Sequence, residues 1–151
     1  MILMSTAKEC VFCGIITGEI SASRVYEDEQ VIAFLDHQPI TPGHVLVVPR
    51  VHVQAFVNLP AEDACRLMAV GQRIDLAIRR SNLRCEAVTL FLSDGRAAGQ
   101  EVPHVHLHVL PRFVGDGFVM RLDYRYREKP GREQLDAAAA EIRKALPETR
   151  Q

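Results

Sequence analysis

The sequence predicts an α+β fold with a mostly antiparallel sheet. Two pairs of short apolar segments have the length and boundaries typical of strands, and one long segment between the pairs has helical periodicity. The 151 residues are enough for a domain with a sizeable hydrophobic core.

The first pair of strands is predicted at residues 31–35 and 45–48. Both are runs of apolar residues bounded by turn-forming or polar residues. The segment 38–43 between them is dense in proline, glycine and polar residues, which favour turns. We therefore expect a hairpin.

The long helix is predicted between Pro60 and Ser81. Acidic residues near its start and Arg79-Arg80 near its end suit the helix dipole. Apolar residues recur there at steps of three and four, as one face of a helix requires: Ala64, Leu67, Val70, Ile74 and Ile78.

The second pair of strands follows the helix. Residues 87–92 read as a buried strand, and the next strand lies between Pro103 and Pro111. Beyond Arg112, a helical stripe of apolar residues from 135 to 146 ends at Pro147. We expect this C-terminal extension, residues 113–151, to pack on the same domain.

Composition excludes several classes of partner. The chain has 18 Lys and Arg against 19 Asp and Glu, so its bulk charge gives no reason to expect nucleic acid or an anionic membrane. No apolar run approaches the roughly 20 residues that span a bilayer, and no leader typical of a signal peptide follows Met1.

We expect a cytoplasmic protein, in which cysteines bind metal or lie in the core. Cys65 and Cys85 are expected in the core.

Three histidines alternate with apolar residues in the segment 104–110. Because side chains alternate faces along a strand, His104, His106 and His108 are expected to share one face of the sheet. A merely solvated face would be built from Lys, Thr or Glu. Clustered imidazoles instead indicate metal or proton chemistry.

Two kinds of site fit these imidazoles. They could hold a catalytic zinc with one open position, or one imidazole could be a nucleophile whose neighbours manage charge and protons. Gly95, Gly99 and the turn at 42–44 suit a phosphate-binding pocket, which favours the second kind.

The segment 104–110, preceded by Gly99-Gln100 and followed by Pro111-Arg112, resembles the signature of the histidine triad superfamily. Residues 41–49 match another characteristic stretch of that family, and Cys10-x-x-Cys13 resembles its bacterial members. The resemblance implies a histidine triad domain within residues 1–112, with a five-stranded antiparallel sheet, one long helix and a short N-terminal helix.

The resemblance also implies a reaction. Family members bind nucleotides and transfer or hydrolyse nucleotidyl groups at the α-phosphate, through a covalent intermediate on the residue that matches His106. His108 matches the group that contacts the phosphate or leaving group, while His104 is the first triad histidine and His44 a supporting one. The substrate is a dinucleoside polyphosphate or a nucleoside phosphoramidate, and the residues at 111–116 favour the former.

Nucleotide-binding positions follow from the same resemblance. Asp36 matches the residue that grips the ribose hydroxyls, although an aspartate before a turn could equally cap that turn. Ser93 and Gln100 match phosphate or leaving-group contacts; Ser93 and Glu101 depart from the residues that better-known relatives carry there. Apolar side chains are expected to flank a purine base: Ile32, Phe34 and Ile40.

The Cys-x-x-Cys spacing of Cys10 and Cys13 is typical of a zinc-binding pair. The resemblance adds His52 and His104, and implies a closed structural zinc site; no organic cofactor is expected. It also implies a homodimer. A different function stays open, that of a purine-nucleotide-binding regulatory protein with little turnover.

Overall fold

The computed structural model describes residues 9–119 and 129–147. The opening residues, on which the expectation about a signal peptide rests, lie outside these ranges. The chain forms two compact units, of which the first ends at Phe118 and the second contains helix α3 (Arg132–Ala145). The packing of the C-terminal extension stays a prediction. Among the described helices, none combines the length and the hydropathy needed to cross a membrane.

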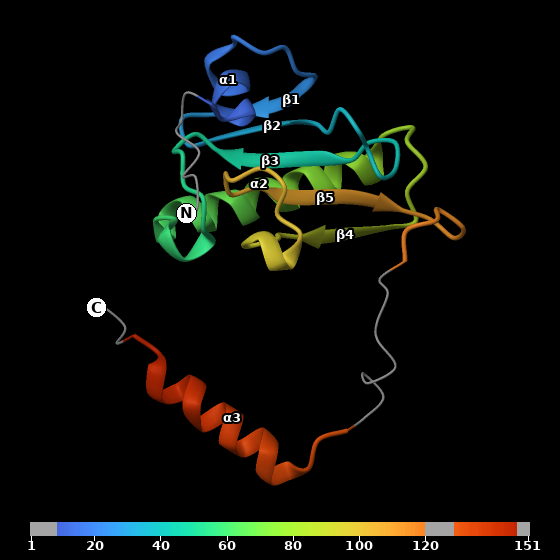
Figure 1. The fold of residues 1–151 in the computed structure, drawn as a ribbon. Coiled ribbons are helices and arrows are strands. Elements are labelled where there is room, and N and C mark those ends of the chain that lie inside the picture. Colours follow the sequence, from blue (N-terminus) through green and yellow to red (C-terminus); the bar gives the residue numbers. More distant parts are fainter. Residues whose placement is uncertain (1–8, 120–128, 148–151) are drawn as a thin grey trace. The chain divides into compact units, whose positions relative to one another are not determined.

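The first unit contains the predicted α+β fold. Its antiparallel strands occur in the order β1-β2-β3-β5-β4 (Figure 1), and α1 (Val11–Thr17) and α2 (Ala61–Arg80) are its α-helices. The expected hairpin is confirmed by the register of β2 against β3. The strands are β1 (Arg24–Glu27), β2 (Val31–Leu35), β3 (Val45–Pro49), β4 (Ala87–Phe91) and β5 (Leu107–Arg112).

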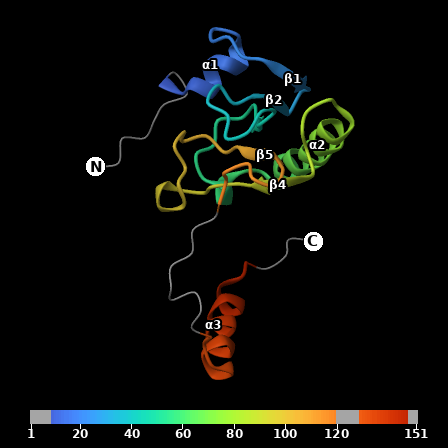
Figure 2. The ribbon, with the colours of Figure 1, turned by 90° about the vertical axis from the view of Figure 1, so that its right-hand side faces the viewer.

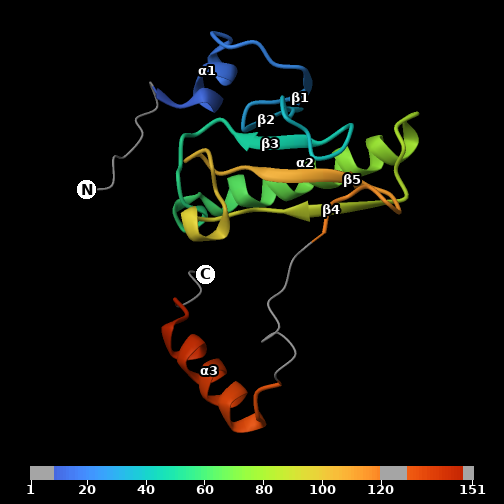
Figure 3. The same ribbon diagram turned by 45° about the vertical axis from the view of Figure 1, so that its right-hand side comes forward.

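Helices cover the sheet on its two faces, because alternate residues of each strand point to opposite sides. The long helix α2 runs along one face (Figures 2 and 3), where it packs on one set of alternate residues. The short helix α1 covers the alternate residues on the other side. The α2 side includes Val31, Ala33, Val45, Val47, Val105, Leu107 and Val109; the α1 side includes Ile32, Phe34, Leu46 and Val48.

Close contact between α2 and β5 depends on Gly71, in the middle of the helix. A Cβ atom at this position would lie 2.7 Å from Cδ2 of Leu107. The glycine therefore lets the helix backbone approach the strand that carries His108.

Three expectations require correction. Residues 87–91 form an edge strand rather than a buried one, because β4 has a neighbour on one side only, and Leu90 is 37% exposed. The triad strand begins at Leu107, so His104 and His106 precede it, although Val105 still points into the core. Cys65 is exposed, because it lies outside the apolar stripe of α2.

A polar cluster around Asp28 ties the β1–β2 turn to α2. Oδ1 of Asp28 accepts the backbone N–H groups of Gln30 and Val31, both at 2.8 Å. Oδ2 accepts the Tyr26 hydroxyl at 2.8 Å and Nε of Arg66 at 2.8 Å. Burial opposes ionisation, but these hydrogen bonds outweigh it and hold the pKa of the Asp28 carboxyl well below its usual range.

We predict that Asp28→Ala lowers the free energy of unfolding by about 1–3 kcal/mol at pH 7, measured by urea denaturation. Because the folded pKa is depressed, the carboxylate stabilises the fold above its unfolded pKa, and this contribution disappears as the pH falls below 3.8 toward the folded value. Asp136→Ala, which removes an exposed carboxylate, is the control, with a loss below about 0.5 kcal/mol. Equal losses in the two variants would contradict the role assigned to Asp28.

Candidate functional site

The triad histidines lie together where the chain enters β5. The ring centroids of His106 and His108 are 4.8 Å apart, and His106 is only 5% exposed. Nδ1–H of His106 donates a 2.7 Å hydrogen bond to the backbone carbonyl of His104. The neutral imidazole of His106 therefore carries its lone pair on Nε2.

A second hydrogen-bond chain fixes the proton on His108. The backbone N–H of Ile40 donates to Nδ1 of His44 at 3.3 Å, so the proton of neutral His44 is on Nε2. That Nε2–H donates to Nδ1 of His108 at 2.9 Å. The remaining proton of His108 must then be on its Nε2.

The two Nε2 atoms of His106 and His108 are the reactive ends of this arrangement. Nδ1 of each ring is engaged in a hydrogen bond within the protein, so Nε2 is the ring nitrogen left for a ligand. The site thus presents one imidazole lone pair and one imidazole N–H side by side.

Burial keeps these imidazoles neutral. It lowers the pKa of His106, and it lowers that of His108 to about 3, with further lowering by the neighbouring His106 and His44. The pKa of His44 is lowered for the same first reason, although Asp36 opposes the shift. Neutral imidazoles at pH 7 can act as nucleophiles and as hydrogen-bond donors.

His44 is placed by a tight turn between β2 and β3. The His44 N–H donates to the Thr41 carbonyl at 3.1 Å, and Gly43 has a φ of +90°, which favours glycine. The buried Thr41 hydroxyl donates to the Pro111 carbonyl at 2.7 Å. The turn is therefore held against the end of β5.

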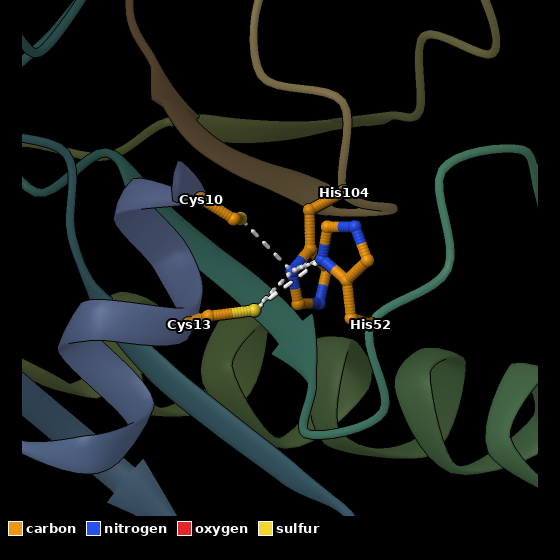
Figure 4. Close-up of side chains that lie close together, drawn as sticks. All are labelled: Cys10, Cys13, His52 and His104. Carbon is orange, nitrogen blue, oxygen red and sulfur yellow. Dashed lines mark hydrogen bonds between the residues drawn. The ribbon is translucent and has the colours of Figure 1, made fainter. Parts of the chain in front are cut away.

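The four expected metal ligands converge beside the triad (Figure 4). Cys10 and Cys13 come from the start of α1, His52 follows β3, and His104 precedes β5. Nδ1 of His104 lies 3.4 Å from Sγ of Cys10 and 3.7 Å from Sγ of Cys13. Nδ1 of His52 lies 3.3 Å from Sγ of Cys13 and 3.3 Å from Nδ1 of His104.

The protonation of this cluster suits a metal ion. Nε2–H of His104 donates to the Pro49 carbonyl at 2.8 Å, so its Nδ1 lone pair faces the thiols and Nδ1 of His52. Burial and the neighbouring Cys10 raise the pKa of the Cys13 thiol to about 11, so a thiolate there requires a cation. Two sulfur and two nitrogen donors form a set that zinc prefers in tetrahedral sites. The residues therefore fit a structural zinc.

Asp36 and Gln100 have contacts within the protein. Oδ1 of Asp36 accepts the Gln38 N–H at 2.9 Å, as a turn cap does, while Oδ2 lies 3.6 Å from Nδ1 of His44. The Gln100 amide accepts from the Gly95 N–H at 2.7 Å and donates to the Gln54 carbonyl at 2.9 Å. Contacts of Asp36 with ribose and of Gln100 with phosphate stay predictions.

The expected base-flanking residues differ in exposure. Ile32 and Phe34 are buried at 0% and 2% exposure, whereas Ile40 is 42% exposed. Sequence reasoning missed Phe12, whose ring lies edge-on to His106 with centroids 5.1 Å apart. Its position between Cys10 and Cys13, the expected metal ligands, is the signal that could have identified it. Ser93 is half-buried in the loop after β4.

Arg112 and Asp116, which favoured a dinucleoside polyphosphate, bind one another. The guanidinium donates to the carboxylate from Nε at 2.5 Å and from a terminal nitrogen at 3.1 Å. It also donates to the Thr89 hydroxyl and the Phe118 carbonyl. Both side chains are thus engaged inside the protein, and the leaving-group class stays a prediction.

Comparison with known proteins agrees with this geometry. The family model of the HIT domain matches residues 17–115. The chain belongs to the histidine triad (HIT) family. It is 44% identical over 137 residues to an uncharacterised HIT-like protein of Mycobacterium tuberculosis, and the match covers 91% of this chain and 92% of that protein.

Solved structures of HIT proteins have the same fold. A zinc-bound histidine triad family protein of Mycobacterium smegmatis is 41% identical with a TM-score of 0.72, and the match covers 93% of this chain and 100% of that protein's chain. A histidine triad nucleotide-binding protein of Candida albicans is 28% identical with a TM-score of 0.78, and the match covers 89% of this chain and 95% of that chain. A HIT family hydrolase of Legionella pneumophila is 34% identical with a TM-score of 0.58, and the match covers 67% of this chain and 90% of that chain.

Proposed function

We propose that this HIT protein hydrolyses or transfers nucleotidyl groups at the α-phosphate of a dinucleoside polyphosphate or a nucleoside phosphoramidate. The observation that carries the proposal is the Nε2 lone pair of His106, fixed by the hydrogen bond at Nδ1, beside the imidazole of His108 with its Nε2–H. The hydrolase of Legionella pneumophila and the nucleotide-binding protein of Candida albicans, both similar in fold, support this class of activity.

The reaction divides one displacement into two. Nε2 of His106 attacks the α-phosphorus, and the bond from phosphorus to the leaving group breaks as the leaving group accepts a hydrogen bond from Nε2–H of His108 and takes a proton from solvent. Water then attacks the nucleotidyl-histidine, loses a proton to solvent, and releases the nucleotide and neutral His106. His108 stays a neutral hydrogen-bond donor throughout.

Tautomer control by neighbouring groups makes both steps feasible. The carbonyl of His104 holds the proton on Nδ1 of His106, which keeps Nε2 available for attack. When His106 is joined to phosphorus its ring becomes cationic, and the same carbonyl stabilises the N–H dipole of that cation. His44 keeps Nδ1 of His108 in the acceptor role.

The nucleoside would be held by the residues that the family resemblance assigns. Oδ2 of Asp36 is available to the ribose hydroxyls, since Oδ1 already caps the turn at Gln38. Ser93 and the loop that Gln100 braces would contact the phosphates. The exposed Ile40 is suited to contact the base, while the deeply buried Ile32 and Phe34 would shape the floor beneath it.

A structural zinc would be held by Cys10, Cys13, His52 and His104. Bound there, it would supply folding free energy and no water activation, because protein atoms fill all four positions. These ligands anchor α1, and with it Phe12, against the segment that carries His106. The zinc-bound relative from Mycobacterium smegmatis supports this assignment.

Assembly into a homodimer is also part of the proposal. The edge strand β4 and the adjoining face of α2 leave apolar side chains exposed, among them Met68 at 54%, Leu76 at 48% and Leu90 at 37%. A hollow of about 410 Å³ is lined by Met68, Ala69, Gln72, Asp75 and Leu90. A second copy would cover this apolar surface and pair the free strand edge.

We predict that His106→Asn abolishes turnover of a fluorogenic adenylyl phosphoramidate and of a diadenosine polyphosphate. Loss of the nucleophile raises the barrier by on the order of 5 kcal/mol, several thousand-fold in rate, while nucleotide binding by calorimetry persists. His37→Asn is the matched control at an exposed histidine.

Near-normal turnover by His106→Asn would contradict the mechanism. If the wild-type protein binds nucleotide but hydrolyses neither substrate, the result would favour a regulatory nucleotide-binding protein. The ratio of the two wild-type rates assigns the leaving-group class.

We predict that Asp36→Ala weakens binding of a ribonucleotide by about 1–3 kcal/mol, because charge-assisted hydrogen bonds to the ribose hydroxyls are lost. Binding of the 2′,3′-dideoxy analogue should change little, and Asp36→Asn should retain most of the affinity. Titration calorimetry with both ligands measures the difference. The same loss for both ligands would show that Asp36 acts on the turn alone.

We predict one zinc per chain in protein purified without chelator, measured by atomic emission. Removal of the metal by a chelator should lower the melting temperature markedly. The refolded, metal-depleted sample should keep most of its turnover rate. Cys13→Ser should reduce zinc to less than about a tenth of an equivalent, while Cys65→Ser, the same change at an exposed cysteine, should not. A metal-free protein with freely alkylated Cys10 and Cys13 would refute the site.

A further inference from the structure

An aromatic column supports His108 on the side away from His44. The His108 ring is stacked on the Phe91 ring with centroids 4.1 Å apart and an interplanar angle of 7°. Phe91 is in turn stacked with Phe118, at 6.3 Å and 15°. Phe91 and His108 are directly opposite one another in the β4–β5 register, so the sheet itself brings their rings together.

The outer member of the column is fixed by the chain that follows β5. Asp116 accepts the Phe118 N–H at 3.0 Å, and Arg112 donates to the Phe118 carbonyl at 2.7 Å. The Arg112 guanidinium also lies 4.7 Å from the centre of the Phe118 ring. The Arg112–Asp116 pair therefore folds the segment back so that Phe118 contacts Phe91.

His108 needs a contact of this kind. The torsion that rotates an imidazole about its Cβ–Cγ bond has a broad energy profile, so many ring orientations are accessible. The hydrogen bond from His44 fixes the position of Nδ1 but allows the ring plane to tilt about it. A parallel ring at van der Waals distance removes that freedom.

We propose that Phe91 is a positioning residue that holds the His108 ring so that Nε2–H points at the leaving group, and that Phe118 supports Phe91 in this role. The inference rests on the proposed function, in which Nε2–H of His108 donates a hydrogen bond to the leaving group. Both phenylalanines act on the orientation of this donor, and their effect should grow as the leaving group becomes more basic.

The test compares two adenylyl substrates that differ in leaving group. An alkylamine phosphoramidate must receive a proton as it leaves, whereas a p-nitrophenyl ester releases a stable anion. Phe91→Leu should slow the amine substrate roughly tenfold or more in kcat with little change in KM, and slow the p-nitrophenyl ester much less. Phe91→Tyr, which keeps the ring, should restore the wild-type ratio, and Phe118→Leu should have a smaller effect of the same kind.

Phe113→Leu is the matched control, because Phe113 contacts Arg84 instead of the column. Nuclear magnetic resonance of the histidine side chains gives a readout independent of turnover. The ring current of Phe91 shifts the carbon-bound protons of His108 upfield, and this shift should disappear in Phe91→Leu and persist in Phe113→Leu. Thermal unfolding identifies variants that fail to fold. If Phe91→Leu does not fold, Phe118→Leu is used in its place for the same comparison.

Equal slowing of both substrates by Phe91→Leu, or an unchanged His108 spectrum, would overturn the positioning role while leaving the proposed function intact. Absence of wild-type turnover with either substrate would overturn the proposed function and the catalytic part of this inference together. The leaving-group dependence separates the two failures.

Discussion

His104 is the residue on which both halves of the site depend. Its Nε2–H is committed to the Pro49 carbonyl, which turns the Nδ1 lone pair toward the thiols of Cys10 and Cys13. Its own backbone carbonyl accepts the Nδ1–H of His106, which frees the opposite nitrogen of that ring. A single residue thus sets the tautomer of the proposed nucleophile and completes the proposed metal site. Both hydrogen bonds persist because His104 is fully buried, where water does not compete for them.

Burial in the fold keeps these closely spaced imidazoles uncharged. Several histidines a few ångströms apart would repel one another if charged, and burial instead lowers the pKa of His104 to about 4 and that of His108 to about 3. Aromatic rings contribute to this burial, since Phe12 lies edge-on to His104 and His106, and Phe91 is stacked on His108. Neutral donor and acceptor groups are therefore surrounded by apolar rings of low dielectric constant.

The parts of the molecule that the sequence predicted are those governed by local periodicity and by residue type. The hairpin, the long helix with its Leu67 stripe, the shared direction of the imidazoles and the convergence of Cys10 with His104 all follow from spacing or from family motifs. The parts it missed depend on long-range pairing. Whether residues 87–91 are buried depends on the order of strands in the sheet, and the contact of Phe91 with His108 depends on the β4–β5 register, neither of which periodicity contains.

Polar side chains near the proposed phosphate site are a second case that residue type does not decide. Gln100, predicted to contact a phosphate or leaving group, bridges Gly95 and Gln54, and Arg112 pairs with Asp116. Residue type alone cannot distinguish a polar side chain that binds substrate from one that braces a loop, because both need the same donors and acceptors. Bracing of this kind has its own consequence for chemistry. Loops already fixed by internal hydrogen bonds present their dipoles without reorganisation when charge develops on phosphorus, which is the condition under which such dipoles stabilise a transition state most.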